Sequence, residues 1–116
     1  MIRVRFAPSP TGYMHVGGLR SALFNYLFSK KNDGTFVLRI DDTDIERSNE
    51  EYEKIIYDSF SWCNIDFDES PLNEGDFGPY RQSERKDIYK NLVSELIENE
   101  KAYYAVYSKE NNEEII

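Results

Sequence analysis

The chain has 116 residues, of which 40% are hydrophobic, so it can form one domain with a sizeable buried core. One cysteine and one histidine exclude an internal disulfide and a closed zinc site, and the net charge of −8 argues against binding nucleic acid by bulk charge. Because no apolar run approaches the roughly 20 residues of a membrane span and the amino terminus lacks a signal-peptide pattern, we expect a cytoplasmic protein without membrane contact.

The first forty residues are predicted to form a strand, a helix and a second strand. Residues 2–6 alternate between apolar side chains and arginine, which indicates a strand that ends at Ala7-Pro8. From Val16 onward, leucine and phenylalanine recur at helical spacing, until the Asn-Asp-Gly sequence at residues 32–34 ends the helix. Residues 35–40 are rich in β-forming side chains without a polar break until Arg39, which is typical of a buried parallel strand.

An acidic loop and a second helix are predicted next. Residues 41–47 are rich in aspartate and glutamate and indicate a loop. Ser48 and Glu51 have the spacing of a capping box, which opens a helix that continues through Trp62. Trp62 and Cys63 are expected to pack in the core.

The remaining residues are predicted to form a loop, a helix and a strand. Residues 64–82 contain two prolines and two glycines, which indicates an irregular loop. Apolar residues at helical spacing predict a helix near residues 83–99, and the aromatic run at 102–107 predicts a strand. This order of elements favours an α/β fold with a parallel sheet.

The densest set of candidate functional residues lies between the first strand and the first helix. Ligands of parallel sheets bind at the carboxyl ends of the strands, where this segment lies. Gly17 and Gly18 allow a ligand to approach the backbone at the helix start, where free amides favour phosphate, and His15 can donate to a phosphate oxygen. Because no lysine follows the glycines, the segment is not a phosphate loop of the Gly-x-x-x-x-Gly-Lys kind.

The distribution of charge also favours an anionic ligand in this region. Residues 1–40 hold six Lys or Arg and one acidic residue, net +5, whereas residues 41–116 hold eight basic and 21 acidic residues, net −13. Arg5 ends a strand that is expected to be buried on both faces, where a charge needs a partner or a ligand. Two interpretations remain: an anion or nucleotide site, and an internal salt bridge from Arg5 to Asp41 or Asp42.

Residues 7–18, Ala-Pro-Ser-Pro-Thr-Gly-Tyr-Met-His-Val-Gly-Gly, resemble the first signature region of class I aminoacyl-tRNA synthetases in its bacterial glutamyl-tRNA synthetase form. The similarity continues through residues 23–26. It resumes, in the order of the family, at residues 38–48, 78–85 and 101–103. The matching blocks extend over nearly the whole chain.

This resemblance implies the first half of a Rossmann-type parallel-sheet nucleotide-binding domain at residues 1–102, followed by the start of an inserted acceptor-arm-binding domain at 103–116. The implied activity is ATP-dependent ligation of L-glutamate to tRNA through a glutamyl-adenylate, with Mg²⁺. It would belong to a longer parent enzyme, expected to be a monomer. The second signature of the class is absent, so the fragment alone is expected to be inactive.

The resemblance also implies roles for individual residues, with His15 as the catalytic residue. Glutamate would be bound by Arg5, Ala7, Ser9 and Asp41. ATP would be bound by Pro8, Thr11, Gly12, His15, Gly17 and Gly18. The acceptor end of tRNA would be contacted by Asp44 and Arg47.

Two departures from the family pattern lead to further expectations about the site. Asp41 stands where the family usually has glutamate, so its shorter side chain must be offset by a shift or a water. Ala105 and Tyr107 occupy positions where some relatives have zinc-binding cysteines, so no zinc and no protein-bound metal are expected.

Two alternatives are left open by the sequence. The shortened glutamyl-queuosine tRNA synthetase, which modifies tRNA, shares Arg5 and the His15 region but usually lacks the form of residues 42–47 seen here. A calcium-binding or acidic interaction module is suggested by acidic residues at the offsets of an EF-hand loop, but Arg47 stands where the sharp turn needs glycine.

Overall fold

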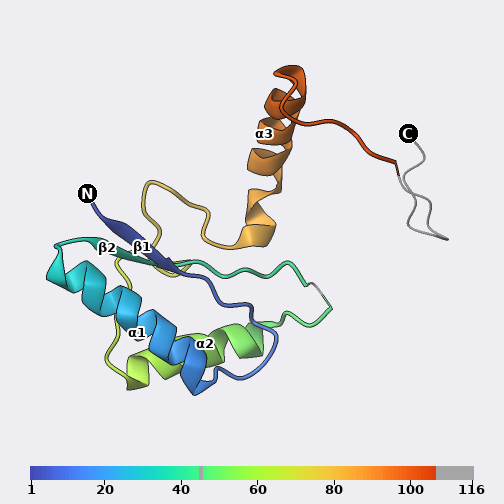
Figure 1. Cartoon of the computed structure of the whole chain (residues 1–116). Helices are drawn as coiled ribbons and strands as arrows, with labels where there is room; N and C mark the ends of the chain where they lie inside the picture. Colours follow the sequence, from blue (N-terminus) through green and yellow to red (C-terminus); the bar gives the residue numbers. More distant parts are fainter. Residues whose placement is uncertain (45, 107–116) are drawn as a thin grey trace. The chain divides into compact units, whose positions relative to one another are not determined.

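The computed structural model describes residues 1–44 and 46–106 and has an α/β fold (Figure 1). Its elements are β1 (Arg3–Phe6), α1 (Val16–Lys31), β2 (Thr35–Leu38), α2 (Glu50–Trp62), the short 3₁₀ helix η1 (Gln82–Arg85) and α3 (Lys86–Glu98). The chain divides into two compact units, Met1–Arg85 and Lys86–Ile116. The expected domain boundary after residue 102 stays a prediction, because residues 107–116 lie outside the described part.

The sheet confirms the predicted parallel arrangement. Strands β1 and β2 pair in parallel, with Arg3 opposite Thr35 and Phe6 opposite Leu38. The loop predicted at residues 64–82 is irregular, but it also hydrogen-bonds to the other edge of β2. There the Leu38 N–H donates to the Glu69 carbonyl and the Ile40 N–H donates to the Tyr80 carbonyl, both at 2.9 Å. In the described part, β2 is therefore the central strand.

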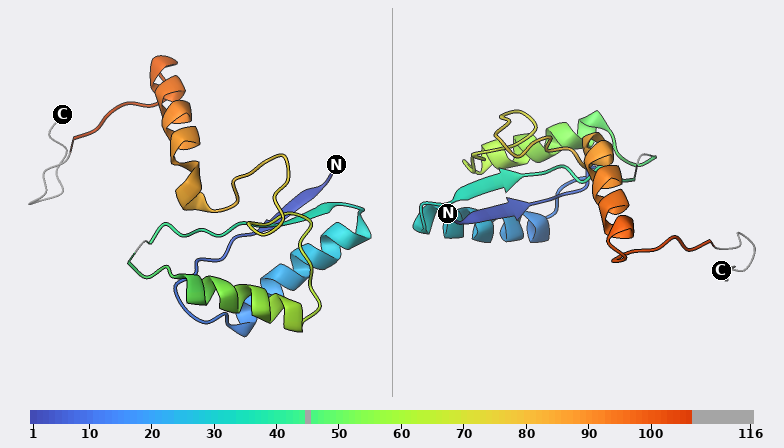
Figure 2. Two further views of the ribbon diagram at one scale, coloured as in Figure 1. Left: turned by 180° about the vertical axis from the view of Figure 1, so that it is seen from behind. Right: turned by 90° about the horizontal axis from the view of Figure 1, so that it is seen from above.

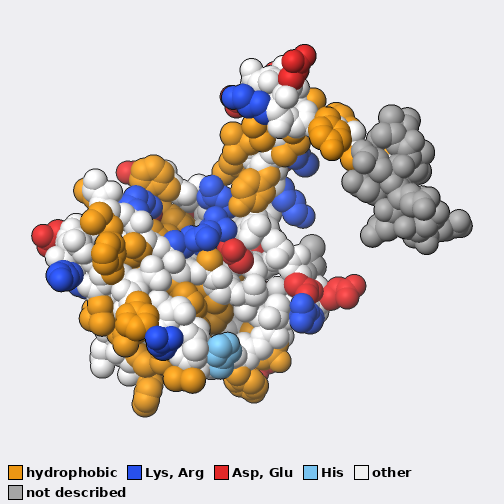
Figure 3. Space-filling view, viewed as in Figure 1, with side chains coloured by type: hydrophobic (Ala, Val, Ile, Leu, Met, Phe, Trp, Pro, Cys, Tyr) orange, Lys and Arg blue, Asp and Glu red, His pale blue; other side chains and the backbone are white. Residues whose placement is uncertain are grey.

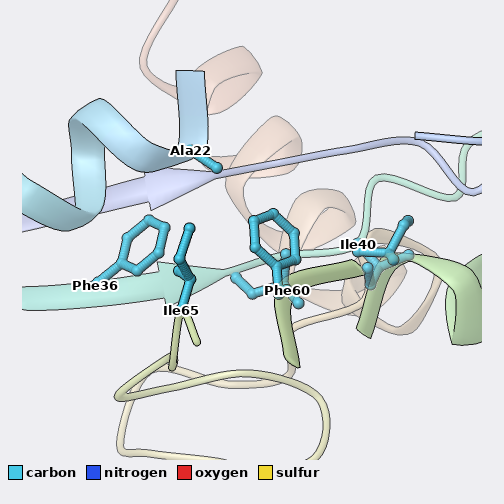
Figure 4. Close-up of a cluster of buried hydrophobic side chains, with 7 residues drawn as sticks. Ala22, Phe36, Ile40, Phe60 and Ile65 are labelled. Atoms are coloured by element: carbon cyan, nitrogen blue, oxygen red, sulfur yellow. The ribbon is translucent and has the colours of Figure 1, made fainter. Parts of the chain in front are cut away.

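The core lies between the sheet and the two helices α1 and α2, which cover the same side of the strands (Figures 1 and 2). Phe36, Leu38 and Ile40 point to this side and are fully buried. They pack with a cluster drawn in Figure 4: Ala22, Ile56, Phe60 and Ile65. Because side chains alternate along a strand, the residues between them face the opposite side of the sheet.

Helix α1 forms at the predicted position, and the face that it buries carries small side chains rather than most of its leucines and phenylalanines. Its buried residues are Ala22 and Ser29, whose small side chains let the helix lie close to the strands. Large apolar side chains on its outer surface are 40–58% exposed: Leu23, Phe24, Leu27 and Phe28. Figure 3 shows hydrophobic side chains over this part of the molecule, with Lys and Arg between them.

Helix α2 begins one residue later than the capping-box spacing predicts. Asn49 is its N-cap, with the side-chain oxygen accepting a hydrogen bond from the Tyr52 N–H at 2.8 Å. The Ser48 hydroxyl is buried without a hydrogen-bond partner in the described part. The backbone N–H of Asn49 donates to the Pro10 carbonyl at 3.3 Å, which fixes where the chain enters the helix.

The end of α2 corrects one expectation about the core. Trp62 is the last residue of α2 and is 83% exposed rather than packed in the core. Cys63 is half-buried and packs against the core cluster, as predicted.

In the second unit, α3 has no buried residue, and the predicted strand at 102–107 is wrong for residues 102–106, which have no regular structure. Residue 107 lies outside the described part. Tyr103 and Tyr104 are 79% exposed, and no described segment offers the backbone partner that a strand requires. Within the described residues, no helix is both long and apolar enough to cross a membrane.

Candidate functional site

The loop between β1 and α1 is fixed by backbone hydrogen bonds to the segment that follows β2. The Arg39 N–H donates to the Phe6 carbonyl at 3.0 Å, and the Asp41 N–H donates to the Pro8 carbonyl at 2.9 Å. These contacts hold the loop at the carboxyl ends of both strands, where the sequence predicts a ligand site.

A pocket of about 300 Å³ lies against this loop, at the lower end of the size range of small-molecule sites. It brings together most of the residues predicted to bind ATP: Pro8, Thr11, Gly12, His15 and Gly18. Ser9 also lines it, whereas Ala7 and Gly17 do not. Apolar side chains complete its lining: Phe6, Tyr13, Met14 and Ile56.

His15 is the N-cap of α1. Its Nδ1 accepts a hydrogen bond from the Gly17 N–H at 3.0 Å, and its carbonyl accepts one from the Gly18 N–H at 3.0 Å. A neutral imidazole that accepts at Nδ1 carries its proton on Nε2. The exposed His15 ring therefore has an Nε2–H donor for a ligand at the positive end of the helix.

Gly17 is required by the packing of this cap. A Cβ at position 17 would lie 2.8 Å from Cε1 and 2.9 Å from Nδ1 of His15, closer than carbon and nitrogen atoms tolerate. The sequence had suggested that Gly17 leaves room for a ligand. In the structure, the absence of a Cβ at Gly17 leaves room for the imidazole of His15 instead.

Arg5 lies on the opposite face of the sheet, in a second pocket of about 200 Å³. Four arginines line this pocket: Arg3, Arg5, Arg39 and Arg85. Contrary to the expectation of a strand buried on both faces, Arg5 is exposed, because no helix of the first unit covers this side of β1.

Three of the four arginines are engaged by protein groups. Arg3 makes a two-point contact with the carboxylate of Glu69, with N–O distances of 2.5 and 2.7 Å. Arg39 makes a similar contact with Asp41, at 2.7 and 3.2 Å. Arg85 donates to the Pro79 carbonyl at 2.7 Å.

Arg5, in contrast, makes no hydrogen bond or ion pair with any described residue. The structure contradicts the alternative interpretation, a salt bridge from Arg5 to Asp41 or Asp42. Asp41 is bound by Arg39, and Asp42 accepts from the Ser83 N–H at 2.8 Å and from its hydroxyl at 2.6 Å. A planar guanidinium without a partner is suited to a carboxylate ligand.

A hydrogen-bonded chain of Arg3, Glu69 and Tyr80 flanks this pocket. The hydrogen bonds from Arg3 hold the pKa of the Glu69 carboxyl below its usual value. Burial, together with the hydrogen bond that the Tyr80 hydroxyl donates to Glu69, raises the pKa of Tyr80. Glu69 is therefore ionised at neutral pH and offsets the charge of Arg3, which leaves Arg5 as the group available to an anion.

The two residues predicted to contact tRNA bind each other. Arg47 Nε donates to Asp44 Oδ2 at 2.6 Å, and this contact holds the pKa of the Asp44 carboxyl below its usual value. Arg47 is exposed, and neither residue lines either pocket. Ile45, between them, lies outside the described residues.

Three of the four acidic residues that suggested a calcium loop are bound by protein groups: Asp42, Asp44 and Glu53. Asp42 contacts Ser83, and Glu53 makes a two-point contact with Arg81. Across residues 1–44 and 46–106, no group of three or more His, Cys, Asp or Glu could hold a metal ion. Whether zinc is absent stays a prediction, because Tyr107 lies outside the described residues.

Sequence reasoning missed Arg39 as a site residue. The available signal was a single charged residue within an otherwise apolar strand sequence, two positions before Asp41. Residues two apart in extended backbone point to the same side, so Arg39 and Asp41 can meet there.

Comparisons with known proteins agree on one family. The family model for the catalytic domain of class I tRNA synthetases (E and Q) matches residues 1–115. Over 116 residues the chain is 59% identical to glutamate–tRNA ligase 1 of Petrotoga mobilis. All of the chain and 24% of that protein are aligned. It is 58% identical over 113 residues to glutamate–tRNA ligase 2 of Caldicellulosiruptor saccharolyticus, aligning 97% of the chain and 23% of that protein.

Solved structures give the same result. The crystal structure of a glutamate tRNA ligase from Elizabethkingia meningosepticum, in complex with its amino acid, superimposes with a TM-score of 0.85 and 44% identity. The superposition covers 96% of this chain and 22% of that one. This chain thus spans about a quarter of the length of the relatives that it matches.

Proposed function

The chain belongs to the catalytic-domain family of class I tRNA synthetases for glutamate and glutamine, and we propose that it is the amino-terminal part of an enzyme that ligates L-glutamate to tRNA. The observation that supports this proposal most strongly concerns the guanidinium of Arg5. It has no partner among the described residues, although its three neighbouring arginines are engaged. The names of the relatives also support charging of tRNA over its modification to glutamyl-queuosine.

In this proposal, glutamate is recognised by charge at both ends. Arg5 binds its side-chain carboxylate in a two-point contact, and Asp41 meets its ammonium group. Ala7 and Ser9, in the loop that follows β1, complete the proposed glutamate site. Glutamine would leave Arg5 without an ionic partner, which disfavours it.

ATP binds in the proposal at the pocket beside the amino end of α1. An oxygen of the glutamate α-carboxylate attacks the α-phosphorus, the bond from that phosphorus to the bridging oxygen breaks, and pyrophosphate leaves. The Nε2–H of His15 and the helix start stabilise the developing negative charge, while Pro8, Thr11, Gly12, Gly17 and Gly18 shape the backbone around the phosphates. The reaction needs no protein nucleophile, so much of the rate acceleration comes from holding glutamate and ATP in the correct relative geometry.

Mg²⁺ would enter with the nucleotide and neutralise phosphate charge. The described residues contain no metal-binding cluster, so we assign no protein ligand to it and derive no step through it. In the second reaction a hydroxyl at the 3′ end of tRNA attacks the activated carbonyl and AMP leaves, with Asp44 and Arg47 near the acceptor end.

We further propose a monomeric cytoplasmic protein, with domains divided after residue 102.

The test is glutamate-dependent ATP–pyrophosphate exchange in the complete protein, comparing Arg5→Leu with Arg20→Leu. Arg20 is a suitable control because it is an exposed arginine that stacks on Phe24 and lines neither pocket. We expect Arg5→Leu to lose glutamate activation by about a hundredfold or more while ATP binding persists. Retained preference for glutamate over glutamine in Arg5→Leu would refute the proposed role of Arg5. Absence of exchange with glutamate in the unmodified protein would refute the function.

A further inference from the structure

Arg39 and Asp41 form a two-point ion pair at the end of β2. Arg39 Nε lies 2.7 Å from Asp41 Oδ1, and its Nη2 lies 3.2 Å from Oδ2. The two side chains are 23% and 24% exposed, so water screens the pair only in part. This geometry fixes both the position and the plane of the Asp41 carboxylate.

The backbone around this pair is anchored on the same side. The N–H groups of Arg39 and Asp41 donate to the carbonyls of Phe6 and Pro8, at 3.0 and 2.9 Å. Neither residue can shift along the strand without breaking these bonds. The ion pair therefore removes the remaining freedom of Asp41, which is rotation of its side chain.

We propose that Arg39 is a positioning residue that holds the Asp41 carboxylate where it meets the ammonium group of the substrate amino acid. This inference rests on the proposed function. Each carboxylate oxygen can accept two hydrogen bonds, and the contact with Arg39 uses one on each oxygen. Both oxygens of Asp41 keep a site for an ammonium donor.

The position of Arg39 in the sheet supports a division of tasks with Arg5. In the register of β1 and β2, Arg5 is opposite Val37, so Arg39 is one diagonal step away on the same face. Arg5 presents a positive charge without a partner, whereas Arg39 is neutralised by the carboxylate that it holds. A ligand with a carboxylate at one end and an ammonium group at the other could meet Arg5 in this pocket and, beside it, the Asp41 carboxylate that the pocket residue Arg39 binds.

The inference predicts a selective effect on amino-acid binding. In the complete protein, Arg39→Gln should raise the KM for glutamate on the order of ten- to a hundredfold, and change the KM for ATP by less than about threefold. Arg39→Lys keeps the charge but not the two-point contact, so its KM for glutamate should lie between those of the unmodified protein and of Arg39→Gln. If Arg39→Gln fails to fold, Arg39→Lys supplies the comparison.

Arg81→Gln is the matched control, because Arg81 makes an equivalent contact with Glu53 and lines neither of the two pockets described above. It should lower the melting temperature and leave the KM for glutamate unchanged. Asp41→Asn combined with Arg39→Gln should be no worse than Asp41→Asn alone, since Arg39 acts through Asp41.

Three results would overturn the inference. The first is a KM for glutamate that is unchanged in both Arg39 variants, and the second is additive losses in the double variant. In either case, unmodified protein that activates glutamate leaves the proposed function intact. The third is unmodified protein that fails to activate glutamate, which removes the proposed function and this inference together.

Discussion

At the scale of single residues, the site depends on which side chains already have partners. Sequence reasoning placed Arg5 and His15 in the site region, because their chemistry and position after the first strand are visible in the sequence. It did not predict that Arg39 binds Asp41, because Arg5 on the neighbouring strand was an alternative partner for Asp41 in the sequence. Which of several possible partners a charged side chain binds depends on side-chain packing, and residue spacing alone does not determine that packing.

Gly17→Ala is expected to act through His15. The new methyl group would displace the imidazole from the helix cap, costing about 0.5–2 kcal/mol of stability. It would also move the proposed phosphate donor, so glutamate activation should fall toward the roughly 10²-fold loss expected for His15→Ala.

The measurement is the activation rate of Gly17→Ala, His15→Ala and the double variant, together with their melting temperatures. Arg20→Ala is a useful control, because Arg20 is an exposed residue of the same helix and lines neither pocket. A normal rate in Gly17→Ala would show that the cap does not position His15 for the reaction.

At the scale of helices and strands, sequence reasoning predicted where the first elements lie but not which face of the first helix is buried. The expected start of α1 at Val16 and its end before residues 32–34 are confirmed. The sequence made no prediction of its buried face, because apolar side chains surround this helix; in the structure the small residues Ala22 and Ser29 face the sheet. The isolated bridges from Val37 to Glu69 and from Ile40 to Arg81 involve single residues in an irregular loop, which have no periodicity to detect.

The N-terminus of α2 offers a direct test of the observed cap. Asn49→Ala should lower the free energy of unfolding by about 1 kcal/mol, because the Tyr52 N–H loses its acceptor. Ser48→Ala should be neutral or slightly stabilising, since its buried hydroxyl makes no hydrogen bond in the described part. Urea denaturation of both variants measures the difference. The reverse order of stabilities would support the capping box that begins at Ser48.

At the scale of the whole first unit, polar contacts join segments that are distant in sequence. Glu69 receives hydrogen bonds from Arg3 of β1 and from the Tyr80 hydroxyl, while Arg81 is bound to Glu53 of α2. These contacts hold the irregular loop against both the sheet and a helix. Part of the stability of the unit therefore depends on ionised carboxylates.

This arrangement predicts how stability varies with pH. The pKa of Glu69 is lower in the folded state than its ordinary value of 4.5, so ionised Glu69 stabilises the fold. That contribution is complete above the ordinary pKa and is lost as the pH falls through the lowered value. Glu69→Gln should lower the melting temperature near pH 7, and the two proteins should converge once the pH has fallen below the lowered pKa of Glu69.

Melting curves of both proteins across this range provide the test, with Asp76→Asn as a control for the loss of one negative charge in the same loop. Parallel pH profiles for unmodified protein and Glu69→Gln would mean that the ion pair with Arg3 does not contribute to acid sensitivity.

The exposure of Trp62 gives the chain an intrinsic optical reporter. It is the only tryptophan, and it borders an apolar groove that it shares with Met14 and His15 at the amino end of α1. An indole in water fluoresces at longer wavelength than one in apolar surroundings. Any molecule or polypeptide that covers this groove should therefore shift the emission toward the blue, so events beside His15 can be followed without a label.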